Sequence, residues 1–229
     1  MPKKSSIKII YEDEFLSIVN KPGGLLVVPA DEDTNKDLTF FLNEMYKEKG
    51  SNIKVYPCHR LDKETSGLMI FAKGKKMQQT VMDMFRERKI KKEYIAFING
   101  DFKRKEGTLK SYIRAAWPYA NKGKKLAITK FQVIVKKKLF SVVRIQTITG
   151  RTNQIRIQFK DIGHPLVGER RFAFARDWPI KFRRTALHAY SLSFKHPVKN
   201  KEIFFQAELP EDMSLFLEKN RVVIPRNMV

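Results

Sequence analysis

The amino-acid sequence predicts a mixed α+β protein built around a largely antiparallel sheet. Short apolar runs with the two-residue period of strands outnumber runs with helical spacing. Many neighbouring runs are joined by short polar turns, which favour antiparallel pairing. Hydrophobic residues make up 42% of the 229 residues and include 17 Phe, so the chain can bury a real core.

The first elements are expected to be strands followed by a helix. Ile7–Tyr11 alternates, Phe15–Val19 is apolar, and the turn Lys21-Pro-Gly-Gly24 precedes the apolar run Leu25–Val28. The helix is indicated by apolar spacing, capping side chains and a terminating glycine: Leu38, Phe41, Leu42 and Met45, then Thr34, Asn35 or Asp37, then Gly50.

A second helix is expected over Met77–Arg88, where one face carries a stripe of Met, Val and Phe that we interpret as core. The run Thr152–Ile162 fits either a strand or a helix, and Thr152 as a cap with Gly163 as a stop favours the helix. The remaining runs predict strands and a closing helix: strands Ile53–Tyr56, Ser66–Ala72, Glu93–Ile98, Thr108–Arg114, Leu126–Val135, Phe140–Thr147, Ala186–Phe194 and Glu202–Glu208, and the helix Asp212–Glu218.

One domain spanning residues 1–229 is expected, because no linker rich in Pro, Gly or Ser divides the chain. The single cysteine, Cys58, excludes an internal disulfide, and the four histidines lack helical pair spacing, so we expect no metal site. The longest apolar runs are too short to span a bilayer, and the N-terminal residues do not read as a secretory signal. These features fit a cytoplasmic protein, and we take a monomer as the default.

The chain carries 46 Lys and Arg against 24 Asp and Glu, a formal net charge of +22. Such a surplus attracts polyanions, and nucleic acid is the commonest of them. A membrane surface is a less favoured partner than nucleic acid. A further alternative is that the charge has no partner and only keeps the protein soluble. Basic clusters, which could form one polyanion-binding face, lie at 73–76, 86–92, 103–105, 122–125, 136–138 and 181–184. Nearby aromatic residues would suit stacking on bases: Phe102, Tyr112, Trp117, Tyr119, Phe172 and Trp178.

The densest polar segment runs from Cys58 to Gly67, between two apolar runs, where catalytic groups tend to lie. Arg60 and Asp62 are two residues apart, so on an extended backbone both point to the same side. The alternative is a structural carboxylate, with Asp62 accepting backbone N–H bonds from Glu64 or Thr65. Spacing alone leaves both interpretations open.

Five segments of the sequence carry motifs that are best considered together. They are Asn20-Lys-Pro-Gly-Gly-Leu25; His59-Arg-Leu-Asp62 with Thr65-Ser-Gly-Leu68 and Phe71-Ala-Lys73; Lys92-Glu-Tyr94-Ile-Ala96; Gly150-Arg-Thr-Asn-Gln-Ile-Arg156 with Ile162-Gly-His-Pro165 and Gly168; and Leu187-His-Ala189 with Leu192, Phe194 and His196-Pro197. Together these segments resemble the RluA family of RNA pseudouridine synthases. They occur in the family's order over most of the chain, which makes the resemblance far more specific than one short pattern.

The resemblance implies the pseudouridine synthase catalytic fold, a long bent sheet with flanking helices and a central cleft. It also implies conversion of uridine to pseudouridine in rRNA or tRNA, with no cofactor. Asp62 matches the essential aspartate, Arg156 the arginine that pairs with it, and Tyr94 the tyrosine that stacks on the target base. A carboxylate suits the reaction because it acts as base or nucleophile at the sugar.

The remaining matches concern substrate binding and the support of the loop. Arg60 matches a residue that fills the gap left by the flipped-out uridine, and His59 is expected to orient the loop. Lys21, Pro22 and Leu187 match positions that either line the pocket or pack beneath the active-site loop. His188 and His196 are expected to be structural.

Two residues depart from the family's third motif, which usually has His where this chain has Asn153 and Gln158. Both replacements keep hydrogen-bonding capacity but lose the option of positive charge. Many relatives also carry a small basic S4 domain before the catalytic one. This sequence starts with the catalytic motifs, so RNA targeting is expected to depend on the catalytic domain's own surface.

The sequence argues against two alternatives to a pseudouridine synthase. A noncatalytic RNA-binding protein on the same fold would be indicated by loss of Asp62, Tyr94 or Arg156, and all three are present. A hydrolase with an aspartate nucleophile would need a second acid or a metal cluster, and the sequence shows neither beside Asp62.

Overall fold

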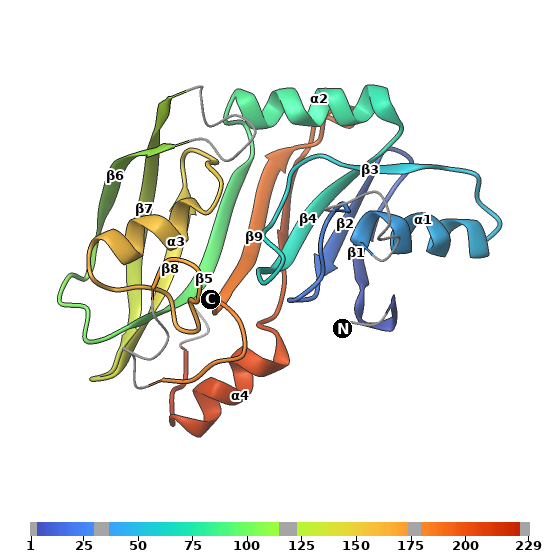
Figure 1. Ribbon diagram of the computed structural model, residues 1–229. Coiled ribbons are helices and arrows are strands. Elements are labelled where there is room, and N and C mark those ends of the chain that lie inside the picture. The colour runs from blue at the N-terminus through green and yellow to red at the C-terminus, as the bar shows by residue number, and fades with distance from the viewer. Residues whose placement is uncertain (1–3, 30–36, 115–122, 174–179, 225–229) are drawn as a thin grey trace. The chain divides into compact units, whose positions relative to one another are not determined.

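The computed structural model describes residues 4–29, 37–114, 123–173 and 180–224 (Figure 1). These residues form strands and helices in the following order: η1 (Lys4–Ser6), β1 (Lys8–Glu12), β2 (Leu16–Lys21), α1 (Leu38–Glu48), β3 (Val55–Pro57), β4 (Ser66–Lys73), α2 (Lys75–Arg86), β5 (Lys91–Asn99), β6 (Glu106–Arg114), β7 (Lys124–Lys136), β8 (Phe140–Thr147), α3 (Gln154–Asp161), β9 (Leu187–Lys195), β10 (Glu202–Gln206) and α4 (Glu211–Lys219). The mixed α+β prediction is confirmed.

The chain divides into two compact units. The first comprises Met1–Ile90 and Ala189–Glu208, and the second comprises Lys91–His188 and Leu209–Val229. Each unit has its own strand pairings and its own buried side chains. The expectation of one domain over residues 1–229 stays a prediction.

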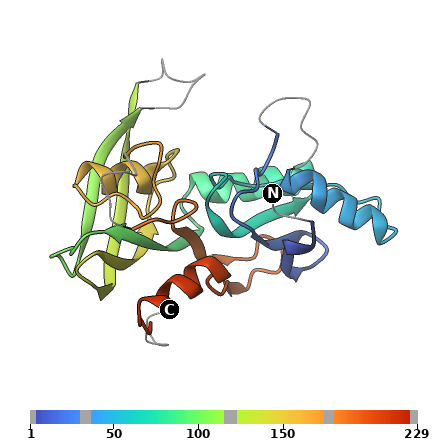
Figure 2. The ribbon, with the colours of Figure 1, turned by 60° about the horizontal axis from the view of Figure 1, so that its bottom comes forward.

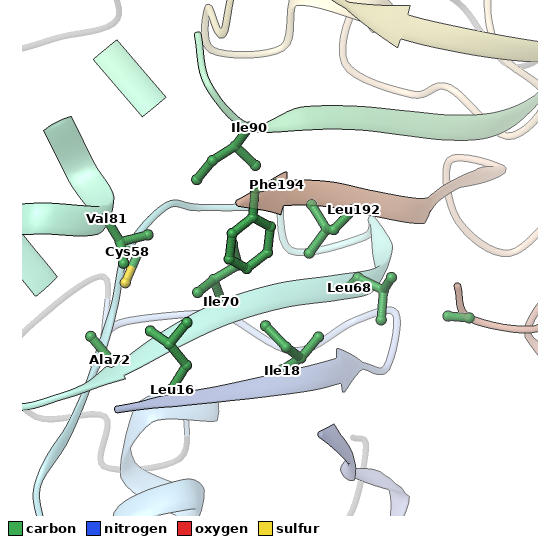
Figure 3. Close-up of a cluster of buried hydrophobic side chains, with 11 residues drawn as sticks. Leu16, Ile18, Cys58, Leu68, Ile70, Ala72, Val81, Ile90, Leu192 and Phe194 are labelled. Atoms are coloured by element: carbon green, nitrogen blue, oxygen red, sulfur yellow. The ribbon is translucent and has the colours of Figure 1, made fainter. Parts of the chain in front are cut away.

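The first unit is built on antiparallel pairs. β2 lies between β1 and β4, β3 also pairs with β4, and β10 pairs with β9. Apolar side chains from β2, β4 and β9, such as Leu16, Ile70 and Phe194, meet in one cluster (Figure 3). Val81 of α2 belongs to this cluster, and Met77 and Met84 pack against it, so the interpretation of the Met stripe as core is confirmed.

The second unit contains the antiparallel order β5, β8, β7 and β6. Figures 1 and 2 both show α3 beside β6 and β7, and the ring of Phe159 in α3 lies 5.9 Å from that of Phe131 in β7. Phe216 of α4 lies 5.3 Å from Phe97 and 5.0 Å from Phe140, measured between ring centroids. Aromatic contacts therefore fasten both helices to this part of the sheet.

Most predicted elements are confirmed with small shifts at their ends. Asp37 is the cap of α1, where its carboxylate accepts a hydrogen bond from the Phe40 N–H, while Thr34 and Asn35 lie outside the described residues. The helical interpretation of 152–162 is confirmed, but Thr152 is not the cap. Asn153 holds that position in a left-handed conformation with φ of 56°.

The strand predicted over Leu25–Val28 is wrong. Leu25 and Val27 are buried as a strand would bury them, but the segment is a bend. The carbonyls of Leu26 and Val27 accept hydrogen bonds from the Leu38 and Thr39 N–H groups, at the start of α1. The free N–H groups of a helix start compete with strand pairing for these acceptors.

No helix among the described residues is long and apolar enough to cross a membrane.

Candidate active site

The polar loop predicted to carry the chemistry joins β3 to β4 in the first unit. Leu61 is buried, whereas Arg60 is exposed and Asp62 is half-buried. The leucine therefore anchors the loop between two charged residues. The Thr65 N–H donates to the backbone carbonyl of Asp62 at 3.1 Å. Thr65 is one of the two residues that the structural-carboxylate alternative names as a donor, and its N–H donates to the backbone carbonyl of Asp62.

Beneath this loop lies a lysine with no exposed surface. The ammonium of Lys21 donates to the carbonyls of Pro22 (3.1 Å), Leu25 (2.8 Å) and Lys63 (3.1 Å). The Gly24 N–H also donates to the Lys63 carbonyl, at 2.8 Å. A buried charge is unfavourable unless it is hydrogen-bonded, so the ammonium depends on these carbonyls. The bonds thereby tie Lys63, the residue after Asp62, to the turn at residues 21–25. The geometry favours loop support over pocket lining for Lys21.

The start of the loop is held by His59. The Ile70 N–H of β4 donates to His59 Nε2 at 3.0 Å, and the His59 ring lies 4.7 Å from that of Phe85 in α2. This arrangement fits an orienting role. Burial raises the pKa of the neighbouring Cys58 thiol to about 12, so it stays uncharged at neutral pH and is a poor nucleophile.

The end of the loop passes close to β9 at Gly67. Its φ is 113°, and a Cβ there would lie 2.2 Å from the carbonyl oxygen of Ala189. Only glycine fits such a close approach of two backbones. Gly67 therefore fixes the path on which the chain leaves the loop and enters β4.

Tyr94 lies on β5 of the second unit and is buried. In the strand register it pairs with Ile145 of β8, which pairs in turn with Phe131 of β7. Paired residues share a face of a sheet, and Phe131 contacts α3 through Phe159. Tyr94 therefore lies on the face of the sheet that α3 covers.

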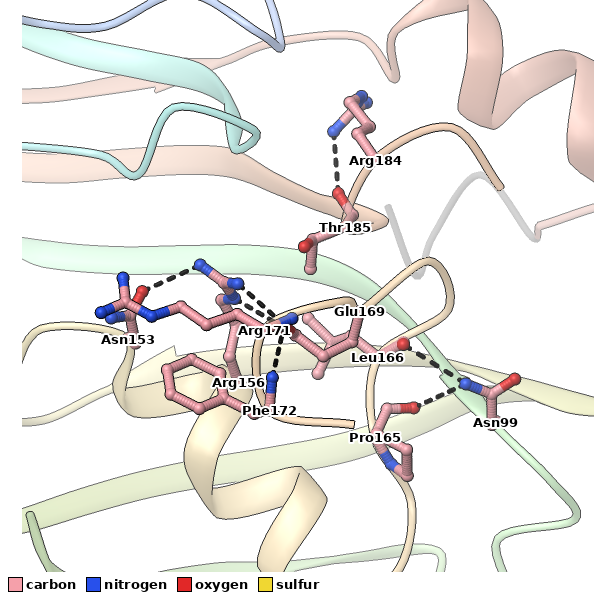
Figure 4. Close-up of polar contacts among 10 residues, drawn as sticks. All are labelled: Asn99, Asn153, Arg156, Pro165, Leu166, Glu169, Arg171, Phe172, Arg184 and Thr185. Atoms are coloured by element: carbon pink, nitrogen blue, oxygen red, sulfur yellow. Dashed lines mark hydrogen bonds and ion pairs between the residues drawn. The ribbon is translucent and has the colours of Figure 1, made fainter. Parts of the chain in front are cut away.

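Arg156 projects from α3 and is buried with its partner Glu169 (Figure 4). Its Nε donates to Glu169 Oε2 at 2.7 Å, and its Nη2 donates to Glu169 Oε1 at 2.8 Å. Burial raises the pKa of Glu169. The hydrogen bond and charge of Arg156, together with two backbone N–H bonds, lower it by more, so the pKa lies below its ordinary value. Glu169 therefore stays ionised opposite the guanidinium.

Gln158, the second departure from the family motif, is a buried structural residue. Its amide nitrogen lies 3.1 Å from both Ser111 Oγ and the Ala127 carbonyl, on β6 and β7. These bonds fasten α3 to the edge of the sheet. A neutral amide suits this buried position, where a positive charge would have to be desolvated.

Lys92 and Arg184 are two further ordered cations in this unit. Burial lowers the pKa of Lys92 to about 8, and its Nζ lies 3.6 Å from where a Cβ on Gly150 would stand. Arg184 binds Asp212 through Nε and Nη2, and its Nη1 donates to the Leu187 carbonyl at 3.2 Å. Arg184 thereby fixes the backbone of Leu187, a buried residue at the start of β9.

The predicted site residues lie in both units: Lys21, His59, Arg60 and Asp62 in the first, and Tyr94, Arg156 and Leu187 in the second. Within the first, Lys21 and His59 support the loop of Asp62. Sequence reasoning missed Glu169 and Arg184. The signals for them are weak, since Glu169 follows a motif glycine, Gly168, and Arg184 lies in a basic cluster.

Comparison with known proteins places the chain in a family. The sequence profile described as RNA pseudouridylate synthase matches residues 16–161, more than half of the chain. The dual-specificity RNA pseudouridine synthase RluA of Vibrio cholerae is 36% identical over 86% of this chain and 80% of the relative. The ribosomal large subunit pseudouridine synthase D of Zymomonas mobilis is 31% identical over 95% of this chain and 74% of the relative.

A solved structure shows the same fold. Human RNA pseudouridylate synthase domain containing 4 superimposes with a TM-score of 0.78 and 24% sequence identity, over 95% of this chain and 94% of the other. The chain belongs to the RNA pseudouridylate synthase family, whose members convert uridine to pseudouridine in RNA. The family and fold implied by the five motifs are therefore confirmed.

Proposed function

We propose that this protein isomerises specific uridines in rRNA, tRNA or both, with Asp62 as the catalytic carboxylate acting on a flipped-out uridine. The observation that carries the proposal is that the family match over residues 16–161 includes Asp62, Tyr94 and Arg156. A binding protein that had lost activity would have no need to keep all three. The relative named for the ribosomal large subunit supports rRNA as a substrate, and the relative named for dual specificity supports more than one kind of RNA substrate.

The reaction is a rearrangement that leaves the composition unchanged. The C1′–N1 bond breaks, the base turns, a C1′–C5 bond forms, the C5 hydrogen leaves and N1 gains a proton. Asp62 acts at the sugar as base or nucleophile while the uracil leaves as an anion. Tyr94 stacks on the uracil through its apolar face and is a candidate to take the C5 proton.

The catalytic carboxylate must be ionised, and the family's arginine–aspartate pairing assigns this task to Arg156. A nearby positive charge lowers the pKa of a carboxylate and favours its anion. We propose one catalytic domain over residues 1–229. The family match, which extends from the first unit into the second, supports this proposal.

Arg60 and Leu187 are the proposed substrate contacts. Arg60 is exposed on the loop next to Leu61, as a residue that fills the gap left by a flipped base must be. Leu187 offers an apolar side chain close to the uracil, with its backbone held by Arg184. We further propose a monomer in the cytoplasm that needs neither metal nor cofactor.

RNA binding is proposed to extend to the outer face of the β6–β7 ribbon. Tyr112 is 68% exposed and pairs with Leu126, which is 39% exposed. By strand alternation and register, the side chains around this pair include four exposed cations: Lys110, Arg114, Lys124 and Lys130. An exposed aromatic ring among cations suits an unstacked base with its phosphates.

Release of the C5 hydrogen tests the proposed function. Unmodified rRNA and tRNA transcripts carrying tritium at uridine C5 are incubated with the protein, and the pool that releases tritium defines the substrate class. Log affinity for RNA should fall by about 0.7 per phosphate contacted for each tenfold rise in salt. Tight binding without release from any pool would favour the noncatalytic RNA-binding alternative.

A further inference from the structure

Glu169 is built into the second unit by a tight turn. Its N–H donates to the Leu166 carbonyl at 3.1 Å, across Gly168, which has φ of 77°. A Cβ on Gly168 would lie 2.0 Å from the Arg184 carbonyl oxygen, so only glycine permits this turn. The backbone therefore delivers the Glu169 carboxylate to one place.

The carboxylate is fully engaged there. Oε1 accepts from the N–H groups of Arg171 (2.9 Å) and Phe172 (3.2 Å) in addition to Arg156. The Phe172 ring lies against the guanidinium, with 5.1 Å between the Arg156 Cζ and the ring centroid (Figure 4). Glu169 thus fixes one edge of the guanidinium and, through the backbone of Phe172, an aromatic ring over its face.

Asn153 holds the guanidinium at another nitrogen. The Nη1 of Arg156 donates to Asn153 Oδ1 at 2.9 Å. Asn153 lies in the left-handed region, which Asn, Asp and His tolerate better than other residues that have a Cβ. The position therefore demands a residue that accepts φ above zero and also offers an acceptor, and both Asn and the family's usual His meet this demand.

We propose that Glu169 and Asn153 are positioning residues that together fix the plane and orientation of the Arg156 guanidinium, which the proposed reaction needs in one place. This role rests on the proposed function. A guanidinium has five N–H donors in a rigid plane, and the three bonds described use three of them. Because the plane is fixed by one carboxylate and one amide, the directions in which the remaining N–H groups of Arg156 donate are fixed as well.

The main test is Glu169→Gln, which keeps the size of the side chain and removes its charge. We expect kcat for tritium release to fall about 100-fold, because a small misplacement of a catalytic group has effects of that size. The Kd for RNA should stay within about threefold, since Glu169 is buried. Glu93→Gln is the matched control, because Glu93 also pairs with an arginine, Arg144, at 2.6 Å. Glu93 precedes Tyr94 on β5, so the two side chains face opposite sides of the sheet. The kcat of Glu93→Gln should change by less than about threefold.

Asn153 offers a test that does not disturb the buried ion pair. Asn153→Gly keeps the left-handed backbone and removes the acceptor, and we expect kcat to fall about 10-fold. Asn153→His restores an acceptor and should keep kcat within about threefold of wild type. Full activity of Asn153→Gly would overturn the role of Asn153.

A double-mutant cycle separates positioning from a general structural role. If Glu169 acts through Arg156, Glu169→Gln should have little further effect on kcat in an Arg156→Lys background. Additive losses would contradict the proposal, as would a kcat of Glu169→Gln within about threefold of wild type. Either result leaves the proposed function intact.

A readout without turnover keeps the two proposals apart. The Nε–H of Arg156 should exchange slowly with water in NMR spectra of the wild type and rapidly in Glu169→Gln, as it does in exposed arginines. Fast exchange in the wild type would overturn the positioning role even in an active enzyme. Slow exchange in a wild type that releases no tritium from any RNA would instead overturn the proposed function.

Discussion

The loop of Asp62 and the side chain of Arg156 are held by different kinds of contact. In the first unit a buried ammonium, Lys21, donates to three backbone carbonyls and so fixes the path of the main chain. In the second unit a buried guanidinium is bound by the side chains of Glu169 and Asn153. The loop is therefore fixed through its backbone, whereas the arginine is fixed through its charge and its plane.

The largest effect on stability is expected from Lys21→Met, which removes the support of the loop. Three carbonyls lose a charged donor, so the free energy of unfolding should fall by about 3 kcal/mol. Displacement of the Asp62 loop should lower kcat about 100-fold. Urea unfolding and tritium release measure the two effects.

Lys63→Met provides the control for Lys21. Lys63 is exposed, and its backbone carbonyl takes part in the support. Its replacement should change the free energy of unfolding by less than about 0.5 kcal/mol. Equal destabilisation by both variants would show that the backbone contacts of Lys21 do not hold the loop.

A second prediction concerns a network in the first unit that should affect stability without affecting catalysis. Asp13 accepts hydrogen bonds from the Phe15 and Leu16 N–H groups, and its Oδ2 lies 2.9 Å from His196 Nε2 and 2.7 Å from Lys199 Nζ. Burial raises the pKa of Asp13, but the hydrogen bonds from Lys199, Tyr11 and the two backbone N–H groups lower it more, so the pKa lies well below its ordinary value. The ionised carboxylate therefore stabilises the folded state.

Asp13→Asn should lower the free energy of unfolding by about 2 kcal/mol at pH 7 and leave kcat unchanged within about twofold. The folded pKa lies below the unfolded one, so the stabilisation is present above about pH 4 and is lost as the pH falls through the folded pKa. The difference in free energy of unfolding between wild type and variant, measured with urea, should be about 1 kcal/mol smaller at pH 3 than at pH 7. A difference that stays constant between pH 7 and pH 3 would contradict this account.

The smallest effect is expected from Tyr112→Ala on the β6–β7 ribbon. Loss of one stacked base should weaken RNA binding about 10-fold, with kcat at saturating RNA unchanged. Phe204→Ala is the matched control, because Phe204 is 59% exposed on β10 but is flanked along the strand by Glu202 and Gln206. Equal effects of the two variants in a binding titration would remove the ribbon from the RNA-binding surface.

The elements of the fold were largely predictable because apolar periodicity survives in the individual segments. The failure at Leu25–Val28 had a physical cause that periodicity cannot show, since the start of α1 takes the carbonyls that a strand would use. The cap of α3 was also missed, because Thr152 has the usual chemistry of a cap while Asn153 accepts the left-handed backbone.

The site was predictable where motifs are dense and obscure where partners are far apart in sequence. The segment around Asp62 gathers many polar residues between strands, and the family motifs point to Tyr94 and Arg156. Glu169 lies 13 residues after Arg156 in a turn without periodicity, so only the structure pairs them. For the same reason, the support of Asp62 by Lys21 appears only once the fold joins positions 42 residues apart.

The most direct test of the account is tritium release from C5-labelled uridine RNA by wild type and Asp62→Asn. We predict release by wild type from rRNA or tRNA, and a loss of at least about 10³-fold in the variant. RNA affinity of the variant should stay within a few-fold, because its fold and its cationic surface are unchanged. Release that survives in Asp62→Asn would contradict the role of this carboxylate, and so would a collapse of RNA binding together with activity.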